Sequence, residues 1–103
     1  MGQQQKIGKT ATKIRVEAGK TFVRYHATDV VAFDADTITL NSGGWRTATT
    51  KSRMNQTANE YNLPFQVFQK KHNWFVTIGS ETVEFTDGMT FARRQVYAMK
   101  GGK

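Results

Sequence analysis

The sequence has no cysteine, a single proline and no hydrophobic run long enough to cross a bilayer. The absence of cysteine excludes disulfides, thiolate zinc sites and cysteine nucleophiles. It fits a reducing cytoplasm, although a virion or secreted protein without cysteine is also compatible with it. The first six residues lack the apolar centre of a signal peptide. We therefore expect a cytoplasmic protein that does not associate with membranes.

Acidic residues are also scarce, with eight Asp and Glu against 15 Lys and Arg, which gives a formal net charge of +7. The charge is uneven along the chain: residues 1–24 carry +5, residues 25–45 carry −3 and residues 46–73 carry +4. Two basic blocks thus flank an acidic one. A basic surface attracts polyanions at long range, and a basic small domain is a first indication of nucleic-acid binding.

The chain is long enough for one domain with a modest core, since 38% of its 103 residues are hydrophobic and 12% are aromatic. We expect a single globular domain over residues 11–100. Residues 1–10 are polar and contain Lys6 and Lys9, which predicts a flexible basic arm.

Short runs of β-forming residues separated by turn residues predict antiparallel strands at 11–16, 21–26, 30–33, 37–40, 65–69, 74–78 and 82–85. Residues 89–99 fit both a short amphipathic C-terminal helix and a strand. The pattern places the fold in the α+β class, as a small antiparallel β-sheet or partly open barrel of six to seven short strands with one mid-chain helix.

That helix is expected at about residues 49–62. Thr49 or Thr50 offers an N-cap hydroxyl, and Asn62 suits a left-handed C-terminal residue before Pro64. Met54, Ala58 and Tyr61 follow helical spacing and form one narrow apolar stripe.

The most distinctive segment is residues 43–56, which begins with Gly43 and Gly44. In one interpretation, the helix N-terminus and the side chains that follow bind a phosphate while the tryptophan stacks on a base. In the other, the glycines form a turn, the tryptophan anchors the core and the cations are solvated. The segment lacks the Gly-Lys-Ser/Thr of a P-loop. The side chains concerned are Trp45, Arg46, Lys51 and Arg53.

A second basic site is expected at the tip of a hairpin, where Lys70 and Lys71 precede His72. A basic tip can contact a nucleic-acid backbone, and aromatic side chains on the outer face of the hairpin would form a base-stacking platform. Alternatively, the tip is charged only because turns are exposed, and the aromatic residues form the core. These aromatic residues are Phe65, Phe68, Trp74 and Phe75.

Catalytic and metal-binding patterns are missing from the sequence. His26 and His72 have no carboxylate or second histidine at ligand spacing, and Asp34 and Asp36 lack the later acidic ligand of a calcium loop, which favours a turn. The serines and threonines have no neighbouring base. We therefore expect no enzyme activity, no metal and no cofactor.

Residues 41–56, with the pattern GGWRT-x-TT-x-x-x-MNQ, resemble a segment of small tailed-bacteriophage proteins, and the similarity extends to residues 65–70 and 74–76. The resemblance implies a phage-like origin and a host-cytoplasm setting. It transfers no functional residue.

The sequence favours a non-enzymatic nucleic-acid-binding protein, for DNA or RNA and without sequence specificity. Two alternatives stay open: a phage protein that binds and modulates a host protein, and a homo-oligomeric virion component. In the favoured hypothesis, Trp45 or Trp74 stacks on bases, and the phosphate contacts are Lys6, Lys9, Lys13, Arg46, Lys51, Arg53, Lys70 and Lys71.

Overall fold

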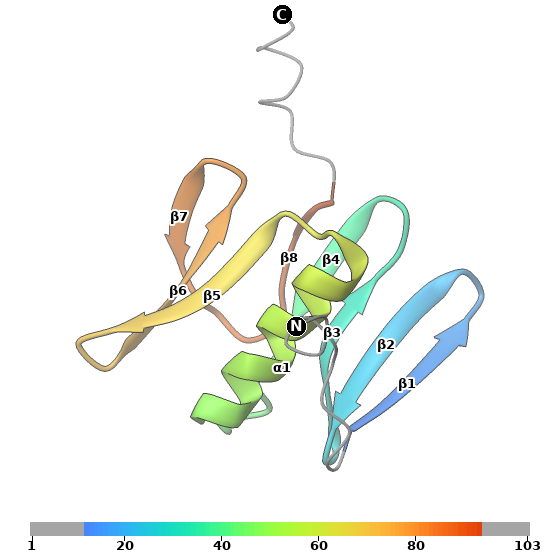
Figure 1. Ribbon diagram of the computed structural model, residues 1–103, viewed down its shortest axis with the longest axis horizontal. Coiled ribbons are helices and arrows are strands. Elements are labelled where there is room, and N and C mark those ends of the chain that lie inside the picture. Colours follow the sequence, from blue (N-terminus) through green and yellow to red (C-terminus); the bar gives the residue numbers. More distant parts are fainter. Residues whose placement is uncertain (1–11, 94–103) are drawn as a thin grey trace, which may run out of the picture.

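The structure is a computed structural model that describes residues 12–93. Eight short antiparallel strands form two open sheets, and one helix connects the fourth strand to the fifth (Figure 1). The predicted α+β class is therefore correct. The elements are β1 (Thr12–Glu17), β2 (Lys20–Tyr25), β3 (Thr28–Phe33), β4 (Thr37–Leu40), α1 (Ala48–Tyr61), β5 (Phe65–Lys70), β6 (Asn73–Ile78), β7 (Glu81–Glu84) and β8 (Met89–Ala92).

The larger sheet has the strand order β1-β2-β3-β4-β8, and the smaller has the order β5-β6-β7. Tight turns connect most neighbours. In the turn between β3 and β4, one carboxylate oxygen of Asp34 accepts hydrogen bonds from the backbone N–H groups of Asp36 and Thr37, both at 2.8 Å. This is the turn predicted from the two aspartates.

Helix α1 begins one residue earlier than predicted, and its N-cap lies two to three residues before the expected caps. Thr47, with an extended backbone, is the N-cap, and its hydroxyl oxygen accepts from the N–H of Thr50 at 3.2 Å. The expected caps, Thr49 and Thr50, lie inside the helix, where the hydroxyl of Thr50 is buried and hydrogen-bonds with the hydroxyl of Thr47 at 3.1 Å. Asn62 adopts the predicted left-handed conformation at the C-terminal end.

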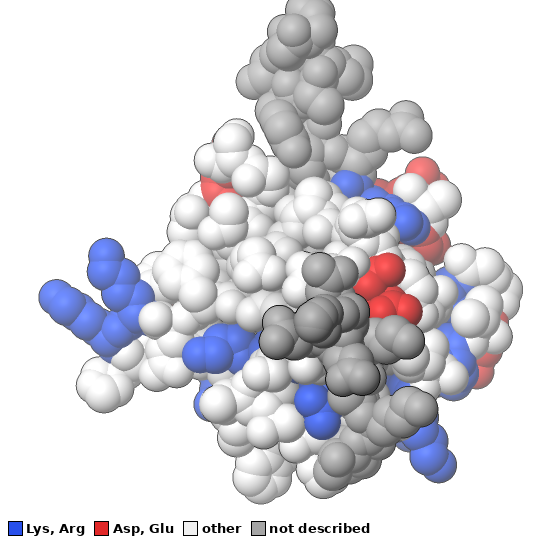
Figure 2. All heavy atoms as spheres, viewed as in Figure 1, with Lys and Arg blue, Asp and Glu red and all other residues white. Residues whose placement is uncertain are grey.

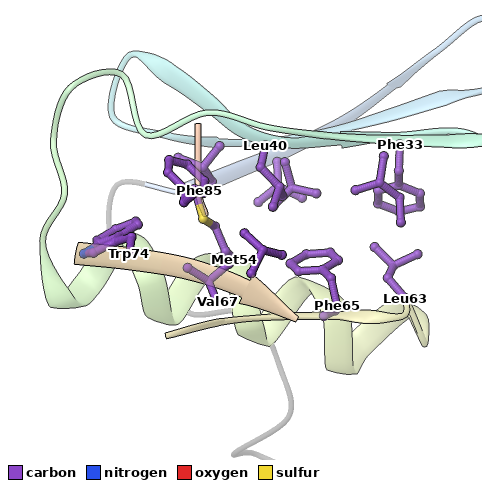
Figure 3. Packing of buried hydrophobic residues seen from close by; sticks show 14 residues of the cluster. Phe33, Leu40, Met54, Leu63, Phe65, Val67, Trp74 and Phe85 are labelled. Atoms are coloured by element: carbon purple, nitrogen blue, oxygen red, sulfur yellow. The ribbon is translucent and has the colours of Figure 1, made fainter. Parts of the chain in front are cut away.

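The core fills the space between the larger sheet and a second layer made of α1 and the smaller sheet (Figure 3). Phe33 and Leu40 of the larger sheet face Phe65 and Val67 of β5, and Met54 of α1 lies between the layers. Trp74 and Phe85 close one end, with ring centroids 5.4 Å apart. The apolar stripe predicted for the helix is thus part of the core.

The segment at residues 89–99 begins as a strand, not as a helix. Met89 and Phe91 of β8 pair with Leu40 and Ile38 of β4, so the apolar side chains alternate with period two and point into the core. The remainder of that segment, and the predicted arm at residues 1–10 with Lys6 and Lys9, lie outside the described residues.

Candidate functional site

The two glycines of the distinctive segment form a turn between β4 and α1. Gly43 and Gly44 have φ angles of +66° and +88°, a region that disfavours residues with a Cβ. Gly43 also lies directly against Thr28 of β3, so that a Cβ at this position would collide with the Thr28 hydroxyl. The turn closes with a hydrogen bond from the N–H of Trp45 to the carbonyl of Ser42 at 3.0 Å.

Asp87, in the turn before β8, fixes this loop from the other side. One of its carboxylate oxygens accepts from the N–H and the hydroxyl of Ser42 at 2.8 and 2.7 Å. The other oxygen lies 3.7 Å from the Arg46 guanidinium. Asp87 could not be predicted as a partner of this loop from local patterns, because the contact joins positions 45 residues apart.

The loop leaves Trp45 on the surface, with 70% of the residue exposed. Trp45 therefore is not the core anchor that the second interpretation required. It lies at a pocket of about 380 Å³, which is within the range of ligand-binding pockets. The pocket is lined by Tyr25, His26, Thr28, Val30, Ser42, Trp45 and Thr50.

The aromatic wall of the pocket comes from the end of β2 and from the turn that follows it. The rings of Tyr25 and His26 lie 4.3 Å apart, and His26 takes a left-handed backbone with φ of +58°. Both residues were predicted on a strand, which is correct for Tyr25 and wrong for His26, and neither was expected to line a site. They belong to the pocket only because β2, β3 and the start of α1 meet here.

Arg53 supports this wall and does not face solvent as we expected. It is 9% exposed, its Nε donates to the Thr12 hydroxyl at 2.9 Å, and its Cζ lies 5.4 Å from the centre of the Tyr25 ring. Because Arg53 is buried under Tyr25, it is not a phosphate contact in this structure.

Trp74 is also placed differently from the prediction. It is 2% exposed and packs in the core, so its ring is not accessible to a base in this structure. Arg46 and Lys51 lie over its ring instead, at 5.9 and 5.8 Å from the ring centre. Lys51 also donates to the side-chain oxygen of Gln69 at 3.4 Å.

The tip of the β5–β6 hairpin is exposed, as expected, and its two lysines extend the group of cations that Arg46 and Lys51 begin. Lys71 and His72 have left-handed backbones that close the two-residue turn, and the side chains of Lys70 and Lys71 are exposed. Figure 2 shows basic side chains projecting at this tip, at the far left of the view. Together, Arg46, Lys51, Lys70 and Lys71 form what we call the basic patch.

The outer face of this hairpin carries one aromatic pair. Phe68 and Phe75 are cross-strand neighbours with ring centroids 5.7 Å apart, and Phe68 is exposed. Phe65 points inward to the core. The predicted platform is thus reduced to two rings, of which one is half-buried.

Lys13 lies away from the basic patch. It pairs with Arg24 across β1 and β2, on the face of the larger sheet opposite to the buried Val23. On that face the basic and acidic blocks of the sequence neutralise each other, since Asp29 accepts from Arg15 at 3.0 and 3.2 Å and from Arg24 at 3.3 Å. The hydrogen bonds from Arg15 are the main reason why the pKa of Asp29 lies below its ordinary value.

The described residues carry little of the net charge. Residues 12–93 contain ten of the 15 Lys and Arg and all eight Asp and Glu, which leaves +2 of the total of +7. The remaining five charges belong to residues 1–11 and 94–103. The folded body is therefore locally basic at the basic patch rather than basic throughout.

Within residues 12–93, no three His, Asp or Glu side chains gather as metal ligands. The same part of the chain has no helix with the length and hydropathy of a membrane span.

The family comparison agrees with the phage resemblance of residues 41–56. Residues 1–92 match the family model described as Kyanoviridae Gp96 protein, and the match includes the Gly43–Gly44 turn and the hairpin tip. Neither the curated proteins nor the solved structures contain a match to the chain. The chain is thus phage-encoded and belongs to the Kyanoviridae Gp96 protein family.

Proposed function

We propose that this protein binds single-stranded nucleic acid, with Trp45 and its pocket contacting bases and the basic patch contacting phosphates. The observation that carries the proposal is the exposure of Trp45 at the rim of an aromatic pocket. A tryptophan held 70% exposed by a fixed loop leaves apolar area in water that a stacked base would cover.

The structure of the loop supports a binding role because Trp45 is exposed on a rigid support. The Gly43–Gly44 turn packs on Thr28, and Asp87 binds the backbone just before it. A preorganised aromatic side chain loses little conformational freedom when it stacks. Bases are accessible for stacking in single strands, whereas they are paired and stacked inside a duplex.

The basic patch supports the same proposal through charge. Arg46 directly follows Trp45, and Lys51 lies in the first turns of α1, so both cations accompany the stacking side chain. Lys70 and Lys71 extend the patch along the hairpin. On single strands, each phosphate that is neutralised contributes about −0.7 to the slope of log K against log salt.

The test is a titration of fluorescently labelled 20-mers of oligo-dT, oligo-U and a DNA duplex with the full chain, followed by anisotropy over a series of salt concentrations. We expect binding to the single strands that weakens with salt, and weaker binding to the duplex. Absence of binding at low salt, or affinity that does not depend on salt, would contradict the proposal. The DNA and RNA arms distinguish which polymer is preferred.

Two variants separate stacking from charge. Trp45→Ala should weaken binding by roughly tenfold to a hundredfold at every salt concentration, because a base–aromatic stack contributes about 1–3 kcal/mol. Phe68→Ala, which also removes an exposed aromatic side chain, is the matched control and should leave affinity within about twofold. Lys70→Gln with Lys71→Gln should flatten the salt slope by up to about 1.4.

A further inference from the structure

The first strand, β1, is an edge of the larger sheet. Among the described residues it pairs with β2 on one side only, and the β1–β2 hairpin extends past the helix and the smaller sheet (Figure 1). An edge strand exposes unpaired backbone N–H and C=O groups that another strand can bind.

Two side chains of β1 on the core side, Ile14 and Val16, are apolar but exposed. Ile14 lies beside the fully buried Val23 of β2, yet it is 47% exposed, and Val16 is 67% exposed. They account for two of the four large hydrophobic side chains exposed in the described part of the chain. An apolar pair next to an open backbone edge is a typical feature of strand-addition interfaces.

We propose that two copies of this chain pair through β1 as antiparallel strands, which joins their larger sheets into one ten-stranded sheet in a twofold-symmetric dimer. The strand that pairs with the open edge of β1 is thus β1 of the second copy. The proposal is independent of nucleic-acid binding, since Ile14 and Val16 belong neither to the pocket nor to the basic patch.

Symmetry and the sheet faces leave few possible registers. The core-facing residues of both copies must lie on the same side, so a residue must face a partner whose number differs from its own by an even number. Two such registers pair five residues of each strand: one places Arg15 opposite its own copy, and the other places Ile14 opposite its own copy.

The charges on β1 select the first register. With Arg15 on the twofold axis, Ile14 faces Val16 of the second copy, and Lys13 faces Glu17, so that each dimer contains two apolar pairs and two pairs of opposite charge. With Ile14 on the axis, Lys13 faces Arg15 twice, and two pairs of like charge oppose pairing.

The selected register brings the two Arg15 side chains together, and the fold already compensates these charges. The guanidinium of Arg15 binds Asp29 through two hydrogen bonds and lies 4.3 Å from the centre of the Phe22 ring. Its Nε also donates to Glu17 of the same strand at 3.0 Å, so the charge of Arg15 is shared between two carboxylates. Charges on an edge strand ordinarily prevent pairing with other strands, and here they leave one favourable partner.

Cysteine trapping tests the dimer directly, because the natural chain has no cysteine. Facing Cα atoms in antiparallel strands are about 4.5–5.5 Å apart, which suits a disulfide. Arg15→Cys should therefore give a disulfide-linked dimer under mild oxidation. Ile14→Cys should not, because residue 14 and its copy are then diagonal neighbours at about 7–8 Å.

Two controls keep the trapping interpretable. Ser80→Cys, at an exposed turn between β6 and β7, gives the rate of random collision. The double variant Ile14→Cys with Val16→Cys leaves Arg15 in place and should link two copies through two disulfides. Linking by Ile14→Cys alone, or linking of Arg15→Cys and of the double variant no faster than Ser80→Cys, would overturn the proposal.

A charge exchange tests the register without cysteine. By sedimentation equilibrium, Lys13→Glu and Glu17→Lys should each weaken dimerisation by about tenfold or more, because each replaces two attractive pairs with two repulsive ones. The double variant carrying both changes restores opposite charges and should return to within about twofold of the natural chain. A natural chain that stays monomeric at millimolar concentration, or a double variant as weak as the single ones, would overturn the proposal.

Discussion

The two tryptophans of this chain both lie close to Arg46 but have opposite environments. Trp45 precedes α1 in a loop fixed by Ser42 and Asp87 and is 70% exposed, whereas Trp74 is the second residue of β6 and is 2% exposed. Both were candidates for base stacking because of their basic neighbours. The comparison shows that burial, and not the neighbouring charge, separates a surface available to a ligand from a core contact.

The difference also explains how two residues of the basic patch, Arg46 and Lys51, are positioned. The ring of Trp74 lies beneath Arg46 and Lys51 at about the same distance from each. A cation near an aromatic face is attracted by its quadrupole. Trp74 therefore supports the cations from inside the fold, while Trp45 stands beside them in solvent.

The largest expected difference between the two tryptophans is in their contribution to stability. Trp74→Ala should lower the free energy of unfolding by about 3–5 kcal/mol, because it removes a large side chain from the packed end of the core. Trp45→Ala should change it by less than about 0.5 kcal/mol, as expected for an exposed residue. Urea denaturation followed by circular dichroism measures both, and equal losses would contradict the assignment.

The next effect concerns the turn that exposes Trp45. Gly43→Ala should destabilise the protein by about 2–4 kcal/mol, because it combines a left-handed backbone with a collision against Thr28. Gly44→Ala is the matched control: it has the same backbone strain but open space around its Cβ, and should cost only about 1–2 kcal/mol.

The collision itself can be isolated by a second substitution. Thr28→Ala removes the atoms that the new Cβ would meet, so it should recover part of the loss in Gly43→Ala and none of the loss in Gly44→Ala. An equal effect in both backgrounds would show that Thr28 does not determine the position of the turn.

A smaller effect is expected at Asp87. Asp87→Ala should cost about 1–3 kcal/mol, because it leaves the N–H and hydroxyl of the buried Ser42 without an acceptor. Asp87→Asn keeps an acceptor oxygen and loses mainly the surface ion pair with Arg46, which contributes about 0–1 kcal/mol. If both variants unfold at the same urea concentration, the hydrogen bonds to Ser42 are not what fixes the loop.

The smallest effect is the dependence of stability on pH. The pKa values of Asp29 and Asp34 are lowered in the fold, by the hydrogen bonds from Arg15 and by backbone N–H groups respectively. The stability that these two carboxylates contribute is fully present above the ordinary aspartate pKa of about 3.9. It is lost as the pH falls through their lower pKa values in the folded state. Thermal unfolding from pH 6 to pH 2 should show this decline, and Asp29→Asn should make it shallower. An unchanged profile in Asp29→Asn would contradict the role of Arg15.

Much of the fold could be predicted from local patterns. Alternating residues such as those of β4, turn residues such as Asp34, and the left-handed Asn62 all depend on neighbours in sequence, and the structure confirms them. Residues 89–99 could not be assigned from the sequence because the spacing of their apolar residues fits both a helix and a strand. Pairing with β4 makes Met89–Ala92 a strand.

The candidate site could be predicted only in part. Arg46 and Lys51 were expected from the distinctive segment at residues 43–56, and Lys70 and Lys71 from the predicted hairpin tip. Tyr25, His26 and Asp87 were missed because they meet the loop only after the strands pair, and Arg53 was misplaced because charge alone does not reveal burial.

The most direct test of the central claim uses Trp74→Phe, which leaves Trp45 as the single tryptophan. We predict that Trp45 fluorescence in this variant is readily quenched by iodide, that oligo-dT quenches it in a saturable titration, and that bound oligo-dT then protects it from iodide. Trp45→Phe, which retains only the buried Trp74, should show neither effect. A Trp45 signal that oligo-dT leaves unchanged, under conditions where anisotropy reports binding, would contradict the claim that this side chain contacts bases.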